Sequence, residues 1–393
     1  MTTIKKNLFV LLGLLFIQPV FADPFIPKDD SQVLEKLSSK FSKPISKELK
    51  KLHLELLKEP KDKKLVISFA KKCIELSRIE SDPRYLGYAE AVIKPWAHTK
   101  SPDILIIKAT IRQSLHDFKG ALEDLSEALE LEPDASQAWL TKAQIYNTLG
   151  EYENAKINCA HLLVDVNQLA SFACLSSVAS LNGETDKGYN LLNRIINNSL
   201  NANLSIDEKT WALTLLGEIA ARKGDNLLAE KHFKEALKQN SQDNYLLTAY
   251  SDFLLNIDNP KEVITLLKDK TRIDSLLLRL ALAEKKLQLP DFKKHLTDLR
   301  NRFIASNLRG DKIHLREEAI FNLKLENNSK RALDLAQKNW TIQKEPLDVQ
   351  IFLESAIATN NKSAVKAVID FLQYSKLEDK NIQRLTEEIK SLK

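Results

Sequence analysis

Residues 138–155 read AWLTKAQIYNTLGEYENA and contain two helical patterns separated by one glycine. Trp139 and Ala143 lie about one helical turn apart, so they share a face of the first helix. Gly150 interrupts that helix, and Ala155 falls on the second one. Two closely approaching helices need a small side chain at their contact, which Ala143 and Ala155 provide. Because glycine readily adopts the left-handed conformation that ends many helices, the stretch predicts a helical hairpin.

The marker residue that opens the second helix recurs along the chain, at Ala121, Ala155, Gly188, Ala229 and Val263. The intervals are close to one constant period, except for a longer step between Gly188 and Ala229. A period near 34 with two helices per unit is typical of tetratricopeptide repeats, and the chain resembles that family. The resemblance implies an all-α fold, a right-handed α-solenoid of antiparallel helix pairs.

The resemblance is strongest over residues 102–243. Lys142, Cys159 and Asn167 depart from the pattern, which usually has a leucine, a large apolar residue and a proline there. One hairpin cannot bury its apolar face alone, so we expect successive hairpins to stack. The residues that follow the family pattern are Ala109, Phe118, Ala121, Leu125, Ala128, Pro133, Trp139, Ala143, Tyr146, Gly150, Tyr152, Ala155, Leu162, Phe172, Leu175, Ser176, Gly183, Leu192, Leu216, Gly217, Gly224, Ala229, Phe233, Ala236 and Leu237.

The family pattern fades on both sides of this core while the helical periodicity persists. Asn327 and Asn360 mark turns where the pattern has glycine. A solenoid also needs a terminal helix that shields its last apolar face. We expect a signal peptide over residues 1–22, a loose lead-in over 23–44, repeat-like helices over 45–101, core repeats over 102–270, degenerate repeat-like helix pairs over 271–376 and a capping helix over 377–393.

The N-terminal segment, MTTIKKNLFVLLGLLFIQPVFA, has the three parts of a secretory signal peptide. Lys5 and Lys6 precede an apolar run, and small side chains precede a cleavage site after Ala22. The run is short for a membrane span, although an uncleaved anchor is the alternative. We expect a periplasmic or secreted protein without an integral span after cleavage, with a bacterial periplasm as the first choice.

The charge balance argues against nucleic-acid binding. The 393 residues carry a net charge of +5, and loss of Lys5 and Lys6 with the signal peptide leaves +3. Acidic and basic residues are mixed along each expected helix, whereas a nucleic-acid binder needs a concentrated basic face. The many lysines therefore indicate solvated helix surfaces.

Three cysteines occur in the chain, at positions 73, 159 and 174. Cys159 lies on the second helix of one unit and Cys174 on the first helix of the next, so a disulfide between them is geometrically reasonable. An oxidising compartment would favour it. Two buried thiols that act as small apolar residues are the alternative. Cys73 is then unpaired and expected to be buried.

The sequence carries no recognisable catalytic motif. Its seven histidines are scattered singly, without a second His or Cys at metal-ligand spacing. It contains no nucleophile elbow, phosphate-binding glycine loop or zinc-protease motif. His116 lies in an expected turn between helices, where a capping role is favoured. We therefore expect no enzyme, no cofactor and no metal; a site in the C-terminal half is the alternative.

The resemblance implies a concave groove lined by the first helix of each hairpin and open to a protein partner. The candidate groove residues are Ile106, Thr110, Gln113, Leu140, Gln144, Asn147, Ser177, Trp211, Thr214 and Glu218. Trp211 lies outside the usual tryptophan position; it either anchors a ligand or packs against the connector over 197–209, and packing is slightly favoured.

The charge of the candidate groove side chains indicates which kind of partner the groove can bind. The candidate positions are mostly neutral, so we expect an extended segment or a helix of the partner rather than a captured carboxylate terminus. An assembly or stabilising factor for an envelope complex is an alternative function, and it would bind its partner through the same kind of groove. The sequence does not decide between a peptide, a folded protein and a glycan.

Overall fold

The structure is a computed structural model that describes residues 45–164, 168–197, 205–310 and 314–392. It divides into two compact units, Met1–Lys47 and Glu48–Lys393, and almost all described residues belong to the second. The expected signal peptide and lead-in lie outside the described residues, as does most of the 197–209 connector.

The described residues form helices and no strands. Helix starts follow ordinary capping chemistry; Ser205, for example, forms a reciprocal capping box with Glu208 at the start of α10. The helices of the first half are α1 Ile45–Lys58, α2 Lys63–Glu80, α3 Arg84–Ile93, η2 Lys94–Trp96, α4 Pro102–Ser114, α5 Phe118–Leu131, α6 Ser136–Leu149, α7 Tyr152–His161, η3 Leu162–Val164, α8 Gln168–Leu181, α9 Thr185–Ile196 and α10 Ile206–Lys223.

The second half continues in the same manner, with short turns between successive helices. Its helices are α11 Asn226–Gln239, α12 Asn244–Asn256, α13 Pro260–Leu267, α14 Asp274–Leu287, α15 Phe292–Arg309, α16 Leu315–Lys324, α17 Ser329–Trp340, α18 Pro346–Ala358, η5 Lys362–Val365, α19 Lys366–Ser375 and α20 Lys380–Ser391.

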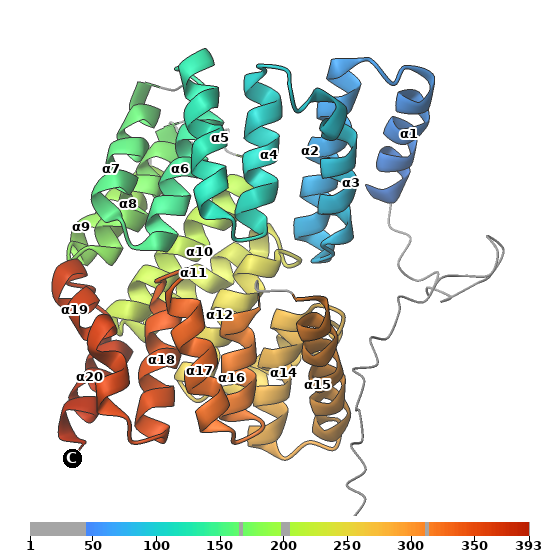
Figure 1. The fold of residues 1–393 in the computed structure, drawn as a ribbon. Coiled ribbons are helices and arrows are strands. Elements are labelled where there is room, and N and C mark those ends of the chain that lie inside the picture. The colour runs from blue at the N-terminus through green and yellow to red at the C-terminus, as the bar shows by residue number, and fades with distance from the viewer. Residues whose placement is uncertain (1–44, 165–167, 198–204, 311–313, 393) are drawn as a thin grey trace, which may run out of the picture. The chain divides into compact units, whose positions relative to one another are not determined.

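Consecutive helices pack as hairpins, and the hairpins stack in chain order (Figure 1). The first helices of successive hairpins also contact each other, so α4, α6, α8, α10, α12, α14, α16 and α18 form one continuous inner row that ends at α20. Each hairpin thus covers the apolar face of its neighbour. The predicted fold, an all-α α-solenoid of antiparallel helix pairs, is confirmed.

The small residues of the repeat pattern lie at helix contacts, as predicted. Ala109 is 0% exposed and Ala143 is 1% exposed. A side chain at Gly217 on α10 would meet the Phe233 ring of α11 at 2.9 Å, which explains the glycine there. The buried apolar residues form two smaller clusters near α1–α6 and one large cluster that runs from α6 to α20.

The turns within and between hairpins use left-handed residues of two kinds. Gly150 and Gly224 have φ values of 76°, which glycine adopts without strain. Gln288, Asn327 and Asn360 hold φ between 51° and 55° at equivalent turns later in the chain. The predicted turns at the two asparagines are therefore confirmed.

The C-terminal hairpins lie against the N-terminal ones, which the sequence did not predict. The backbone N–H of Lys344 donates to Thr148 O at 2.8 Å, and its ammonium donates to Leu149 O at 3.0 Å. The Thr185 N–H donates to Glu378 at 3.1 Å. Helix α20 also contacts α10. The expected capping helix therefore packs against the middle of the inner row as well as against α18. We refer to these as the closing contacts.

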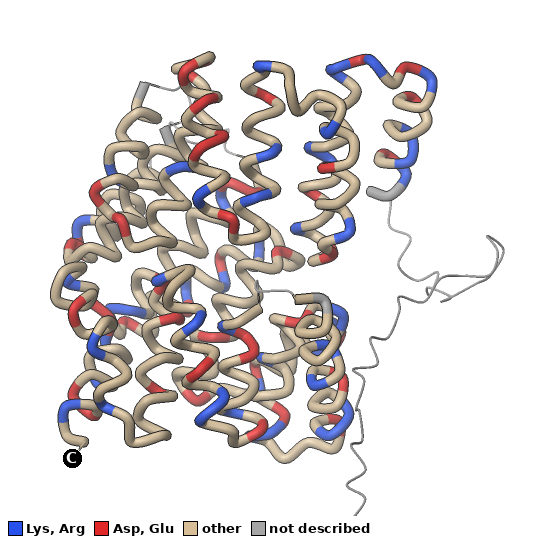
Figure 2. The backbone as a smooth tube through the Cα atoms, in the orientation of Figure 1, with Lys and Arg blue, Asp and Glu red and all other residues tan. Residues whose placement is uncertain are grey.

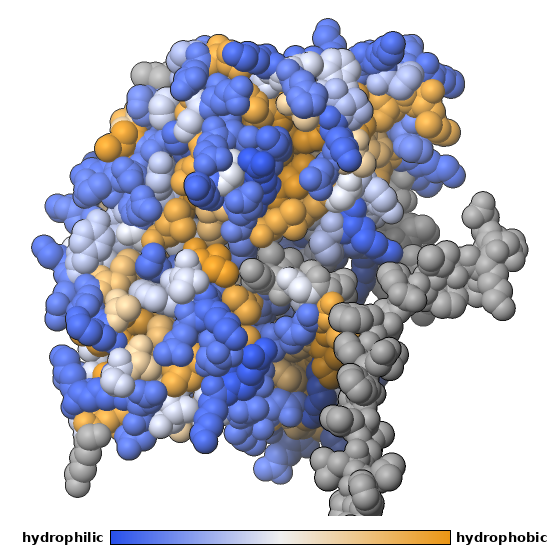
Figure 3. All heavy atoms as spheres, in the orientation of Figure 1, coloured by the Kyte–Doolittle hydropathy of each residue, from blue (hydrophilic) through white to orange (hydrophobic). Residues whose placement is uncertain are grey.

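The outer surface matches the composition. Lys and Arg are interspersed with Asp and Glu over the described helices, without a concentrated patch of one sign in this view (Figure 2). Hydrophilic side chains cover much of the face shown in Figure 3, and hydrophobic ones gather between neighbouring helices. Within the part of the chain that the structure describes, no helix has the length and apolar character needed to cross a membrane.

Candidate partner-binding groove

A cavity of about 1040 Å³ lies along the inner row of helices, and we call it the central cavity. Helices α6, α8, α10 and α12 supply most of one side, and α14, α16, α18 and the start of α20 supply the rest. Of the ten candidate groove residues, the structure places seven on its wall: Gln113, Leu140, Gln144, Asn147, Ser177, Trp211 and Glu218.

The other three candidates do not line the central cavity. Thr110 is 8% exposed, and its hydroxyl donates to Ile106 O at 2.8 Å within the same helix. Thr214 is fully buried and donates to Thr210 O at 2.7 Å. Ile106 packs beside the small core cluster around α4–α6. Thr110 and Thr214 are buried within their own helices, whereas Ile106 shares a face of α4 with Gln113 and is covered by the core cluster.

Helix α10 gives the central cavity its most varied wall. Trp211, Leu215, Glu218 and Arg222 all line it. Their spacing of four, three and four residues places them along one face of the helix. A segment that follows α10 would meet an aromatic ring, an aliphatic side chain, an anion and a cation in that order.

Trp211 both lines the central cavity and packs beside the large core cluster. Trp211 therefore takes part both in the cavity wall and in packing. Its other expected neighbour, the 197–209 connector, lies largely outside the described residues.

Glu218 accepts a hydrogen bond from the Tyr245 hydroxyl of α12. Tyr245 is 49% exposed, but it lines the central cavity, so protein surrounds its accessible surface. Burial raises the pKa of Glu218 above its ordinary value, while Arg222 and the Tyr245 hydroxyl oppose that shift. Burial and the nearby Glu218 carboxylate raise the pKa of Tyr245 well above its usual range. This hydroxyl therefore stays protonated and serves as a donor.

Two arginines reach the cavity from the C-terminal hairpins. Arg279 of α14 is 1% exposed and forms a bidentate pair with Asp252, at 2.9 and 2.8 Å. Arg316 of α16 donates to Glu345 at 2.6 Å, and its Nε lies 2.7 Å from Asp348 Oδ1. Burial raises the pKa of Asp348 to about 6, although the Arg316 guanidinium opposes the shift. Sequence reasoning missed both arginines, although a charge inside the apolar run LLLRLALA was a signal for Arg279.

The neutral part of the wall comes from the N-terminal hairpins. The Asn147 amide of α6 donates to Ser177 Oγ of α8 at 3.1 Å, linking two neighbouring inner helices. The side-chain amide oxygen of Asn147, Oδ1, has no hydrogen-bond partner among the described residues, although it is buried. Such an oxygen can accept a hydrogen bond from a bound molecule.

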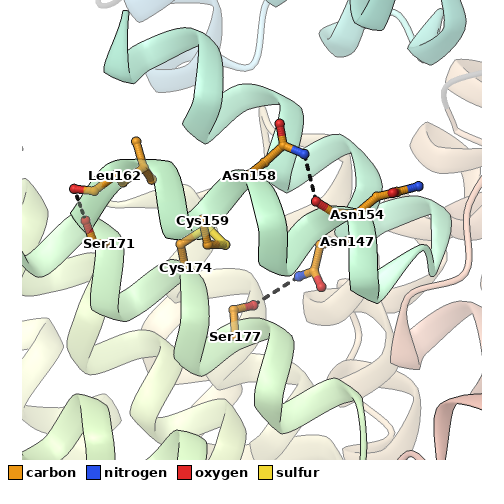
Figure 4. The surroundings of a disulfide bond; sticks show 8 residues. All are labelled: Asn147, Asn154, Asn158, Cys159, Leu162, Ser171, Cys174 and Ser177. Atoms are coloured by element: carbon orange, nitrogen blue, oxygen red, sulfur yellow. Dashed lines mark hydrogen bonds between the residues drawn. A yellow bond between two sulfur atoms is a disulfide. The ribbon is translucent and has the colours of Figure 1, made fainter. Parts of the chain in front are cut away.

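Cys159 and Cys174 are joined by a disulfide between α7 and α8, close to this wall (Figure 4). Their Cα atoms are 5.6 Å apart, and Cys174 itself lines the central cavity. Cys73 is buried, and burial raises the pKa of its thiol to about 12, so the thiol is protonated and unreactive.

The remaining candidate chemistry is structural. His116 occupies the turn between α4 and α5 with φ of 61°, and its ring stacks on Phe118 at 5.4 Å. Within the described ranges, no group of three or more His, Cys, Asp or Glu side chains is placed to hold a metal. The arrangement of the central cavity is that of a polar and apolar binding surface.

Residues 108–155, which run from α4 into α7, match the family model described as tetratricopeptide repeat. No curated protein matches the chain.

Among solved structures, the chain is similar to a human IFIT1 dimer with m7Gppp-AAAA, at 13% identity and a TM-score of 0.40, over 88% of this chain and 86% of that one. It is also similar to Naa15/Naa10 bound to HypK-THB, at 16% identity and a TM-score of 0.29, over 88% and 55%. A third similar structure is the P58(IPK) TPR domain, at 14% identity and a TM-score of 0.23, over 83% and 97%.

Proposed function

We propose that this tetratricopeptide repeat protein is an exported scaffold that binds a segment of a partner protein in the central cavity. The observation that carries the proposal is the wall of that cavity, which combines apolar side chains, neutral amides and charged groups on one continuous row of helices. Ligand sites have this composition: apolar area supplies affinity, and a few convergent polar groups set orientation.

An extended segment or a single helix suits the space best. A cavity of about 1040 Å³ is at the upper end of small-molecule sites and has room for a short stretch of chain. Inner helices of a solenoid can hold such a segment through side-chain amides. Gln113, Gln144 and Asn147 offer amides at one side of the cavity.

Export is the second part of the proposal. Residues 1–22 have the charged, apolar and small-residue parts of a signal peptide. A disulfide between Cys159 and Cys174 is consistent with an oxidising compartment such as a bacterial periplasm. The test has two steps. Free thiols are first alkylated in whole cells. The protein is then unfolded without reductant and alkylated a second time, so that every cysteine outside a disulfide can react. We expect only Cys73 to be modified, and modification of all three cysteines would contradict export.

Partner binding is tested by capture from the periplasmic fraction with the full chain as bait. Substitution of Gln144, Asn147 and Glu218 by alanine should remove one captured protein while the melting temperature stays within a few degrees. The matched control replaces Glu153 and Lys156, which are exposed on the outer helix α7. The same capture by both variants would move the binding site away from the central cavity.

Two other functions share parts of this architecture. An assembly or stabilising factor for an envelope complex would use the same cavity, and its captured partner would be a subunit of that complex. An enzyme with a site in the C-terminal half would use the titratable groups around Arg316. Catalytic turnover of any substrate that persists after alanine substitution of the cavity residues on α6 and α10 would favour this enzymatic function.

A further inference from the structure

The central cavity carries an excess of negative charge. Six carboxylates line it, from Glu218, Asp243, Asp252, Glu317, Glu345 and Asp379. Only four cationic side chains face them, from Arg222, Arg279, Arg316 and Lys380. A positively charged ligand is therefore favoured over a negatively charged one, provided that a carboxylate is free to meet it.

Three of the six carboxylates face the protein's own arginines. Asp252 lies 2.8 Å from Arg279, and Glu317 lies 4.0 Å from the same guanidinium. Glu345 lies 2.6 Å from Arg316. Each of these three charges is thus already compensated in part by an arginine of the protein itself.

Two further carboxylates serve as helix caps. Asp243 accepts the Leu246 N–H at 2.7 Å at the start of α12. Asp379 accepts the N–H groups of Asn381 and Ile382 at 2.9 and 3.0 Å at the start of α20. Helix N-termini stabilise negative charge, so these two carboxylates are also satisfied.

Glu218 is the exception among the six. Its hydrogen-bond partner is the neutral Tyr245 hydroxyl, and no cation lies within 4.0 Å of it in the described part of the chain. Burial raises the pKa of Glu218 although the charge of Arg222 opposes the shift, so the protein compensates this carboxylate only in part. Glu218 is half-buried, and incomplete compensation of its desolvated charge disfavours the folded protein, so a cation on the ligand would offset that cost.

The nearest candidate cation on α10 is directed elsewhere. Arg222 follows Glu218 by four residues, a spacing that permits an ion pair on a helix. Its Nη2 instead donates to Ser180 Oγ of α8 at 2.7 Å. Arg222 Nε has no hydrogen-bond partner among the described residues. Arg222 therefore acts on Glu218 through its charge and not through a hydrogen bond, and Glu218 lies on the wall of the cavity.

We infer that Glu218 determines specificity in the central cavity by pairing with one lysine or arginine side chain of the bound segment. The inference rests on the proposed function and names the chemistry of its ligand. Leu215 and Trp211 precede Glu218 on the same face of α10, and they offer apolar surface to the stem of a long cationic side chain. The carboxylate then meets its charged end, held in place by the Tyr245 hydroxyl.

The test uses the purified full chain and pools of short peptides with blocked termini. The pools share random flanks and differ in one fixed central residue, which is lysine, arginine, norleucine or glutamate. We expect the cationic pools to bind about tenfold or more tightly than the norleucine pool, as for a buried charge pair. Glu218→Gln keeps the shape and the Tyr245 contact and should abolish this preference. Glu153→Gln on α7 is the matched control and should retain it.

The outcomes separate the inference from the function on which it rests. Equal binding of cationic and norleucine pools to the natural chain keeps the groove as a binding site and overturns the role of Glu218. A preference that survives in folded Glu218→Gln also overturns it. Binding of no pool at all overturns both statements. Each variant's melting temperature is measured, and Glu218→Ala replaces Glu218→Gln if the latter fails to fold.

Discussion

The hairpins α4–α11 and the hairpins α14–α19 have the same helix–turn–helix plan and different sequences. The first set uses Gly150 and Gly224 at left-handed turns and contains the residues that match the tetratricopeptide repeat family. The second set places Gln288, Asn327 and Asn360 in the same backbone conformation. The turn geometry therefore persists after the family's glycine has been replaced, because the stacking of hairpins requires the geometry and not the residue.

The two sets also differ in how deeply they bury charge. In the N-terminal set, Asp124 is paired with Lys108 and Arg112, whose side chains are about a third exposed. In the C-terminal set, the side chain of Arg279 is only 2% exposed. His295 and Glu284 form a second buried pair there, at 2.8 Å. Loss of a partner should thus destabilise the C-terminal set more.

The largest expected effect comes from breaking these pairs. Asp252→Ala removes the bidentate partner of the buried Arg279, leaves only Glu317 at 4.0 Å, and should lower the free energy of unfolding by about 3–5 kcal/mol. Asp124→Ala leaves Lys108 and Arg112 able to turn into water and should cost about 1–3 kcal/mol. Urea titration of both variants gives the comparison, and equal losses would show that burial of the cation does not matter. Arg279→Met combined with Asp252→Ala should recover part of the loss.

The disulfide should give the next largest effect, within the N-terminal set. Replacement of Cys159 and Cys174 by alanine removes a cross-link over a sequence separation of 15 residues. The chain-entropy model gives a loss of about 3 kcal/mol for such a loop. Thermal unfolding with and without reductant measures it. The double variant, which retains Cys73, should not respond to reductant, and an unresponsive natural chain would contradict the disulfide.

Exchange of turn residues tests the difference between glycine and non-glycine turns in the two sets. The expected changes in the free energy of unfolding are about 1 kcal/mol. Gln288→Gly relieves a left-handed conformation and should stabilise the protein by about 1 kcal/mol. Gly224→Ala introduces the same strain and should destabilise it by about 1–2 kcal/mol. Asn327→Gly is the control with little change, since asparagine tolerates this conformation. A loss on Gln288→Gly would mean that the glutamine side chain makes a contact that outweighs the strain.

The smallest expected effect is a pH dependence at His116. Burial and the Arg316 guanidinium of the C-terminal set lower the pKa of His116 in the folded protein. The unfolded chain therefore takes up the proton first, below about pH 6.5, and stability falls as the pH decreases. His116→Asn suits the left-handed turn and should reduce the fall between about pH 7.5 and about pH 5.5. Burial lowers the pKa of His232 too, so part of the fall should remain. An identical fall in both proteins would exclude His116.

Local features of the fold could be predicted from the sequence. The spacing of alanines and glycines located the hairpins, and Asn327 and Asn360 located turns beyond the recognisable repeats. Two of the residues predicted to face a groove, Gln144 and Glu218, lie on the wall of the central cavity. Thr214, predicted from the same pattern, is fully buried and does not line the cavity, because it lies next to Leu215 and away from the cavity-facing side of α10.

The closing contacts could not be predicted in this way. Lys344 and Leu149 are 195 residues apart, and their contact depends on the accumulated rotation of many hairpins. A small change of angle per hairpin would separate them, and no local pattern encodes that sum. The charged part of the cavity wall depends on the same closure, because Arg316 and Glu345 reach the cavity only when α16 and α18 lie opposite α6 and α10.

The closing contacts also bear on how the chain unfolds. In an open repeat array each hairpin depends on its immediate neighbours, so the ends fray independently and intermediates accumulate. Here hydrogen bonds between residues 193 to 197 apart join an early hairpin to a late one. Loosening of either of these hairpins therefore weakens the other, and the array gains a cooperativity that neighbour-only coupling lacks. Because such distant pairs must meet before the native state is complete, the last step of folding should be slow compared with the formation of individual hairpins.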